Sequence, residues 1–186
     1  ICDGMGGLEQ GEVASTMVVR AYEQWFLKNL PQILARGFSE EILEKVWYRL
    51  ANDCNVRIAE YSVAQKAPMG TTLTAVLLLE GRYYITHVGD CRVYVMGNGM
   101  EQLTTDQTYV AREVALGHMT PEQALTDARR NVLLQSIGTV KCVKPDYLMG
   151  DFYNDDTFLV CSDGFRHHLT EIELYNYCHT SLEGME

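Results

Sequence analysis

Residues Thr71–Met96 read TTLTAVLLLEGRYYITHVGDCRVYVM, and this stretch decides the fold. It is dense in Thr, Val, Ile, Leu and Tyr, which favour β-strands. Two turn-like pairs, Glu80-Gly81 and Gly89-Asp90, divide it into three runs, namely Thr71–Leu79, Arg82–Val88 and Cys91–Met96. Short turns of this kind join neighbouring strands in hairpins, so the stretch predicts an antiparallel meander.

Upstream of the meander, apolar residues recur at the spacing of amphipathic helices. One helix is predicted over Glu9–Leu30, closed by Pro31. A second is predicted to begin after the N-cap residue Ser39, because acidic residues follow in its first turn. We expect its apolar face to hold Ile42, Val46, Leu50, Cys54 and Ile58.

Downstream of the meander, the pattern is again mixed. Residues from about Asp106 to Gln135 are helical in pattern, with Thr120-Pro121-Glu122 as a helix start. A second hairpin is predicted from Tyr147–Tyr153 and Thr157–Cys161. A last helix is predicted to begin at Thr170, because Thr170 and Glu173 have the spacing of a capping box. Helices followed by a run of antiparallel strands predict an α+β domain in which helices cover the sheet faces.

The composition excludes several classes of function. The formal net charge is −10 and the sequence pI is about 4.9, which argues against a nucleic-acid partner and against docking on an anionic membrane. The longest apolar run, Leu73–Leu79, is too short to span a bilayer. The six cysteines are scattered without C-x-x-C spacing, so we expect a reduced, cytoplasmic protein without a zinc or disulfide framework.

Two apolar runs end at an Asp followed at once by Gly. These are Asp3-Gly4 and Asp163-Gly164. Taken singly, such a pair is usually a turn. Brought together at one rim of a sheet, however, the two carboxylates would offer the hard oxygen ligands that hold Mg²⁺ or Mn²⁺. Asp90 is either part of a hairpin turn or a further carboxylate on the same rim. Arg92 could pair with an acid or a phosphate, or it could equally be an exposed charge.

Other candidate residues carry weaker signals. His87 lies inside an apolar strand and is interpreted as a hydrogen-bonded, semi-buried histidine. Adjacent residues point in different directions, so at most one of His167 and His168 could face a metal, and a structural role is favoured for both. Cys2 and Cys161 adjoin the acidic strand ends, where nearby carboxylates disfavour a thiolate, so neither is interpreted as a nucleophile.

The ordered set of motifs resembles one known family. It comprises Cys2-Asp3-Gly4-Met5-Gly6-Gly7 with Gly11-Glu12, Gly70-Thr71-Thr72, His87-Val88-Gly89-Asp90-Cys91-Arg92, Leu103-Thr104-Thr105-Asp106, Asn131-Val132-Leu133 before Gly138, and Cys161-Ser162-Asp163-Gly164. Over essentially the whole chain, these motifs resemble the metal-dependent serine/threonine protein phosphatases of type 2C, most closely their bacterial branch. The resemblance implies a four-layer α-β-β-α sandwich of two antiparallel sheets flanked by helices.

The resemblance also implies roles for individual residues. Asp3 would bridge two divalent ions, Mn²⁺ or Mg²⁺, with the Gly4 carbonyl on one ion and Asp163 on the other. Asp90 would bind a third ion together with Asp163. Asp3 and Asp163 would then support attack of a metal-bridged water on phosphoserine or phosphothreonine. The segment from Asp106 to about Arg130 corresponds to the family's mobile flap.

The chain departs from the family pattern in places. Residues 1–186 are expected to form a single type 2C phosphatase domain that lacks its first strand and its C-terminal end, each of which carries an acidic ligand in the family. Cys91 replaces the usual Ser, and Asp127-Ala128 replaces the flap's usual His-Pro.

The partners expected for a monomeric enzyme of this kind are phosphorylated proteins and a cognate serine/threonine kinase. The alternative is a non-catalytic module of the same fold that binds phosphoproteins or regulates a kinase. A nucleotide-binding α/β enzyme is disfavoured, because the third Gly of a G-x-G-x-x-G motif would fall at Glu9.

Overall fold

The strands of the central stretch belong to two different antiparallel sheets. The structure is a computed structural model that describes residues 1–6, 8–97, 99–166 and 169–183. One sheet has the order β3-β4-β7, made of Leu73–Leu79, Arg82–Val88 and Asp146–Asp151. The other has the order β6-β5-β8, made of Met100–Gln102, Arg92–Met96 and Thr157–Cys161. A short ladder of β1 (Gly4–Met5) and β2 (Gly70–Thr71) adjoins them.

The predicted meander is therefore only partly right. The hairpin at Glu80-Gly81 is confirmed, since Leu79 pairs with Arg82. At Gly89-Asp90 the prediction is wrong, because β4 and β5 lie in different sheets and the chain crosses between them there. The second predicted hairpin is wrong for the same reason, with β7 paired to β4 and β8 paired to β5. Local alternation reports which residues form strands, but it does not report which strands pair.

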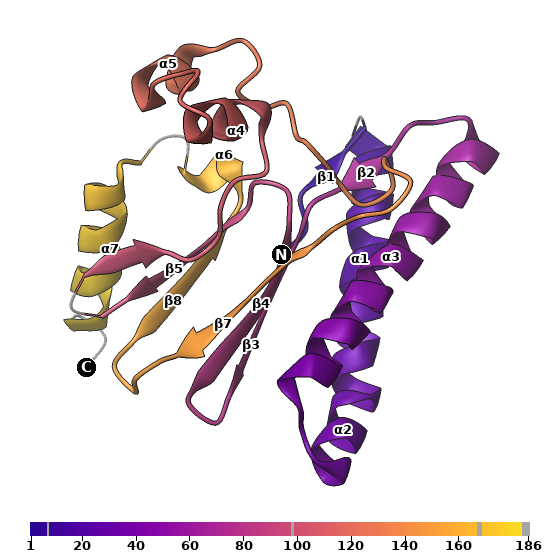
Figure 1. Cartoon of the computed structure of the whole chain (residues 1–186), viewed down its shortest axis with the longest axis horizontal. Coiled ribbons are helices and arrows are strands. Elements are labelled where there is room, and N and C mark those ends of the chain that lie inside the picture. The colour runs from indigo at the N-terminus through magenta and orange to yellow at the C-terminus, as the bar shows by residue number, and fades with distance from the viewer. Residues whose placement is uncertain (7, 98, 167–168, 184–186) are drawn as a thin grey trace.

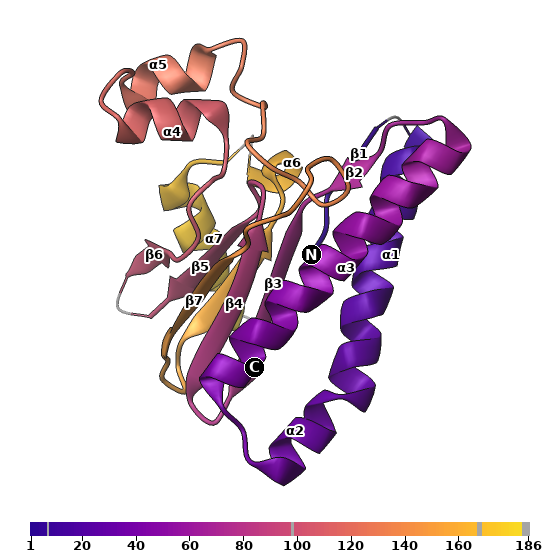
Figure 2. The ribbon, with the colours of Figure 1, turned by 45° about the vertical axis from the view of Figure 1, so that its right-hand side comes forward.

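Helices cover both outer faces of the sheets, as Figures 1 and 2 show. Helices α1 (Leu8–Lys28) and α3 (Glu40–Gln65) lie side by side against the β3-β4-β7 sheet. Helix α7 (Glu171–Glu183) lies on the far side of the other sheet, where Cys178 packs against the buried cluster of Tyr94, Met96 and Cys161. The predicted α+β architecture of helix, sheet, sheet and helix is confirmed.

The two predicted helices of the N-terminal half need correction in detail. Pro31 does not end a helix but lies in the first turn of α2 (Leu30–Arg36), where its missing N–H costs no hydrogen bond. The start of α3 after Ser39 is confirmed. Its predicted apolar face is confirmed at Cys54 and Ile58, which are buried, but Ile42 is exposed, and Leu43 and Trp47 are buried instead.

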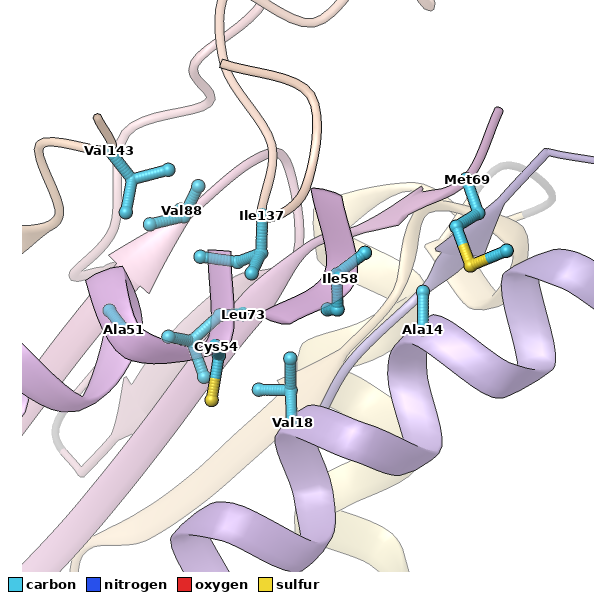
Figure 3. Close-up of a cluster of buried hydrophobic side chains, with 10 residues drawn as sticks. All are labelled: Ala14, Val18, Ala51, Cys54, Ile58, Met69, Leu73, Val88, Ile137 and Val143. Atoms are coloured by element: carbon cyan, nitrogen blue, oxygen red, sulfur yellow. The ribbon is translucent and has the colours of Figure 1, made fainter. Parts of the chain in front are cut away.

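The largest buried cluster joins helices and sheet beneath the metal-ligand candidates. Val18 of α1, Ile58 of α3 and Leu73 of β3 are buried there together with Val88 of β4. Figure 3 shows these side chains directed toward one another from separate elements. Burial of apolar surface of this kind is the main favourable term in folding, and here it fixes the end of β4 next to Asp90.

The segment predicted to be helical after Asp106 is only partly helical. It contains α4 (Tyr109–Ala115) and α5 (Pro121–Thr126), which stand beyond the end of the sheets in Figures 1 and 2. The predicted start at Thr120 is confirmed, because its side chain and that of Gln123 form a capping box. The residues after Thr126 have no further α-helix before β7.

Among the residues that the structure describes, no helix combines the length and the apolar character that a bilayer span requires.

The predicted start of the last helix is confirmed. The Glu173 N–H donates to the Thr170 hydroxyl oxygen at 3.2 Å, and the Thr170 N–H donates to the Glu173 carboxylate at 2.8 Å.

Candidate metal centre

The backbone of Asp3 is held in place by two buried threonines. Its N–H donates to the hydroxyl oxygen of Thr72 at 2.8 Å, and its carbonyl accepts from the Thr72 N–H at 2.9 Å. The Thr71 hydroxyl donates to the same carbonyl at 3.0 Å. With both backbone groups bonded, the half-buried Asp3 carboxyl is held at the end of a strand-like segment.

The structure brings Asp163 to the same place from the other end of the chain. Asp163 opens α6 (Asp163–Arg166), which begins two residues after β8 ends at Cys161. Burial raises the pKa of Asp3, and the charge of Asp163 and a hydrogen bond between the two carboxyl groups raise it further. A carboxyl group whose pKa is raised by a neighbouring carboxylate, and which is hydrogen-bonded to it, lies close enough to that carboxylate for the two to share a proton or a cation.

Asp90 lies at the crossing between the two sheets. Burial raises the pKa of Asp90 to about 6, with further contributions from the charges of Asp163, Asp106 and Asp3, while Arg166 lowers it. The three carboxylates predicted from the sequence therefore share one electrostatic neighbourhood, in which negative charge accumulates.

Gly4 adjoins this neighbourhood in the β1-β2 ladder, opposite Thr71. A Cβ on Gly4 would overlap the backbone of Gly11 in α1, and a Cβ on Gly11 would lie 2.6 Å from the Gly4 carbonyl. Only glycine at both positions allows the strand and the helix to approach so closely. The Gly4 carbonyl that the resemblance assigns to a metal is therefore part of a tightly packed backbone contact.

The donor set fits a hard divalent cation. Carboxylate oxygens are the preferred ligands of Mg²⁺ and Mn²⁺, and a cation would relieve the repulsion between Asp3 and Asp163. Among the described residues, no three His, Cys, Asp or Glu side chains are grouped closely enough to hold one ion by themselves. The carboxylates converge as a pair with Asp90 nearby, so carbonyl oxygens or water would complete the coordination of an ion.

The cysteines next to these carboxylates are suited to structural roles. Burial raises the pKa of Cys2 and that of Cys91 to about 11, and burial also raises the pKa of Cys161. These thiols therefore remain protonated at neutral pH, in agreement with the interpretation that Cys2 and Cys161 are not nucleophiles.

His87 has the structural role expected from the sequence. The side chain is fully buried, with Nδ1 2.9 Å from the Thr74 hydroxyl and Nε2 3.2 Å from the Thr105 carbonyl. Both ring nitrogens are therefore occupied by hydrogen bonds within the fold. His167 and His168 lie outside the described residues.

An ion-pair network next to Asp90 was not foreseen from the sequence. Arg92 donates to both carboxylate oxygens of Asp106, each at 2.8 Å, which resolves its ambiguous role in favour of an ion pair. Arg166 donates to the same Asp106 carboxylate at 3.2 Å and to the backbone carbonyl of Asp90 at 3.3 Å. The only sequence signal for Arg166 was its position three residues after Asp163.

A cleft of about 770 Å³ opens beside this network. Its lining includes Asp90, Arg92 and Arg166 and residues of α4, α5 and α7. Asp3 and Asp163 are not among its lining residues, so the cleft is the space next to the carboxylate pair and does not enclose it.

Comparison with known proteins defines the class. The sequence model of the family described as Protein phosphatase 2C matches residues 1–183. The chain belongs to the protein phosphatase 2C family, a family of metal-dependent phosphatases.

Curated relatives and solved structures agree with this assignment. The serine/threonine phosphatase stp of Listeria innocua is 34% identical over 178 residues, which cover 94% of this chain and 68% of that protein. The phosphatase PstP of Mycobacterium tuberculosis is 34% identical over 88% of this chain and 30% of its own length.

Among solved structures, the Streptococcus agalactiae serine/threonine phosphatase superposes with a TM-score of 0.85 at 27% identity, covering 94% of this chain and 71% of that one. The catalytic domain of PstP in complex with two manganese ions has a TM-score of 0.73 at 29% identity, covering 98% of this chain and 77% of that one. The resemblance inferred from the motifs is confirmed.

Proposed function

We propose that this domain removes phosphate from phosphoserine and phosphothreonine in proteins, with divalent cations held by Asp3, Gly4 and Asp163. The observation that carries the proposal is the convergence of Asp3 and Asp163, two carboxyl groups from opposite ends of the chain. Burial raises the pKa of Asp3, and the nearby Asp163 raises it further. The family assignment and the names of the relatives support the same reaction.

In this proposal Asp3, the Gly4 carbonyl and Asp163 would hold two Mn²⁺ or Mg²⁺ ions. Asp90, together with Asp163, would hold a third. Cations bound there would acidify a water molecule and neutralise charge on the phosphoryl group. The hydrogen bonds with Thr71 and Thr72 fix the position of the Asp3 backbone, and with it the origin of the side chain that would bind the metal.

The remaining side chains fit direct hydrolysis rather than a covalent phosphoenzyme. The thiols of Cys2, Cys91 and Cys161 are held protonated by burial, which disfavours them as nucleophiles. The cleft beside Asp90, covered by α4 and α5, offers room for the residues around a phosphorylated side chain. We assign the control of access to this cleft to the segment from Asp106 to about Arg130.

The physiological setting follows from this activity. The substrates are phosphoproteins, and the activity opposes a cognate serine/threonine kinase in the cytoplasm. The domain acts as a monomer. The alternative, a non-catalytic module that binds phosphoproteins, is not favoured, because the relatives are named phosphatases.

Hydrolysis of a phosphothreonine peptide by the purified, Mn²⁺-loaded protein tests the proposal. Turnover should stop on chelation, and Asp163→Asn should lower it by orders of magnitude with an unchanged circular dichroism spectrum. Asp53→Asn, at an exposed position of α3, is the matched control and should keep full activity. Near-normal turnover of Asp163→Asn would remove Asp163 from the site. Tight peptide binding without any turnover would favour the non-catalytic module.

A further inference from the structure

Asp106 receives two guanidinium groups. Arg92 meets it with two parallel hydrogen bonds at 2.8 Å, a geometry that is among the strongest between charged side chains. Arg166 adds a third contact at 3.2 Å. All three side chains are largely buried, with exposed fractions of 23% for Arg92, 12% for Asp106 and 16% for Arg166. Screening by solvent is therefore weak, and local charge balance matters.

The charges in this network do not balance within it. Arg92 alone compensates Asp106, so the positive charge of Arg166 is left over. The Arg166 guanidinium also donates to the Asp90 carbonyl at 3.3 Å, which places it beside Asp90. Of the charged groups with the largest influence on Asp90, Asp163, Asp106 and Asp3 are anions and Arg166 is the cation. The positive charge of Arg166 that Asp106 leaves uncompensated therefore acts on Asp90.

Arg166 is poorly placed to bind a substrate phosphate. Although Arg166 lines the cleft, its side chain is only 16% exposed, and its buried Nε has no hydrogen-bond partner among the residues that the structure describes. An arginine that binds phosphate presents its fork of donors outward. Here Nη2, which would take part in such a fork, already serves Asp90 and Asp106.

We propose that Arg166 is a built-in cation beside Asp90, which weakens the binding of an additional divalent ion there and leaves the Asp3–Asp163 pair as the tighter metal site. The inference rests on the proposed metal centre. Its physical basis is Coulombic, because a fixed positive charge next to a carboxylate repels an approaching divalent ion and offsets part of the carboxylate's attraction.

Calorimetric titration of the metal-free protein with Mn²⁺ tests this inference without using activity. Arg166→Gln should tighten the weaker, Asp90-dependent binding event by about tenfold or more, as expected for removal of a nearby charge in a poorly screened site. Arg166→Lys retains the charge and should behave like the wild type. Arg49→Gln removes an exposed charge on α3 and should change nothing.

A double-mutant cycle assigns the effect to Asp90. In an Asp90→Asn background, Arg166→Gln should no longer change Mn²⁺ affinity. Circular dichroism checks the fold of each variant. We expect the fold to be preserved, because Arg92 still donates hydrogen bonds to both carboxylate oxygens of Asp106. Arg166→Met, which keeps the packing of the aliphatic stem, is measured alongside in case the glutamine variant unfolds.

Unchanged or weaker Mn²⁺ binding in the folded Arg166→Gln and Arg166→Met variants would overturn the inference while leaving the metal centre intact. The same gain in affinity in the Asp90→Asn background would also overturn it. Absence of Mn²⁺ binding in the wild type and all variants would refute both the metal centre and the inference. Raised KM for a phosphopeptide with unchanged Mn²⁺ affinity would instead assign Arg166 to substrate contact.

Discussion

Thr72 and Asp3 are joined by two hydrogen bonds, with the Thr72 N–H donating to the Asp3 carbonyl and the Asp3 N–H donating to the Thr72 hydroxyl oxygen. The same hydroxyl lies 3.2 Å from the Cys91 sulfur, next to Asp90. One side chain, 2% exposed, therefore bonds the backbone of Asp3 and also contacts the side chain next to Asp90.

Thr72→Val should lower both stability and Mn²⁺ affinity. Valine has nearly the shape of threonine, but it leaves the Asp3 N–H without its acceptor, which costs about 1–3 kcal/mol when the group is buried. Denaturant unfolding measures the first effect and calorimetry the second. Thr72→Ser keeps the hydroxyl and should retain most of both. Equal Mn²⁺ affinity in the valine variant would show that the Thr72 hydroxyl does not position Asp3.

Gly11→Ala should destabilise the domain, although alanine is the better helix former. Gly11 lies in α1, where the substitution would ordinarily stabilise a helix by about 1 kcal/mol. A methyl group there would overlap the Gly4 backbone, so we expect a net loss of at least about 2 kcal/mol in unfolding free energy. Gly99→Ala, where a Cβ meets open space, is the control. A stabilised Gly11→Ala variant would refute the close contact.

His87 should make the domain less stable as the pH falls from 7 to 5. Burial lowers the pKa of His87 below its ordinary value of 6.5, although Asp146 and Asp106 oppose this. The unfolded chain then binds a proton at a higher pH than the folded domain does. Stability is therefore unaffected well above pH 6.5 and decreases as the pH falls below it.

His87→Gln should reduce this dependence of unfolding free energy on pH, since glutamine does not titrate. Denaturant unfolding at several pH values measures the slope. His118→Gln, at an exposed histidine, serves as the comparison. Identical slopes for the wild type and His87→Gln would exclude His87 as the source.

Asp3→Asn should have opposite effects on stability with and without metal. Burial and Asp163 raise the pKa of Asp3, so at neutral pH the ionised carboxyl destabilises the metal-free fold, a penalty that disappears as the pH falls through the folded pKa. In EDTA the variant should therefore melt at a higher temperature than the wild type. In Mn²⁺ the order should reverse, because only the wild type retains the ligand. A variant that gains as much from Mn²⁺ as the wild type would argue against Asp3 as a ligand.

Much of the local structure followed from the sequence. The bounds of β4, the start of α3 after Ser39 and the helix start at Thr120 all agree with the pattern of apolar and capping residues. Capping and strand propensity depend on neighbours in the chain, so they can be read locally. The family could also be inferred, because its short motifs occur in order.

Strand partners and charge partners depended on the tertiary structure. The pattern around Gly89-Asp90 is that of a hairpin, yet the chain crosses there between two sheets. Arg166 reaches Asp106 across 60 positions of sequence, and the carboxyl of Asp163 bonds to that of Asp3 from near the other end of the chain. Such contacts form only when two packed sheets bring distant segments together, and no local periodicity encodes which segments those are. The sequence alone thus determined which residues could bind a cation, while only the packing of the two sheets decided which of them meet.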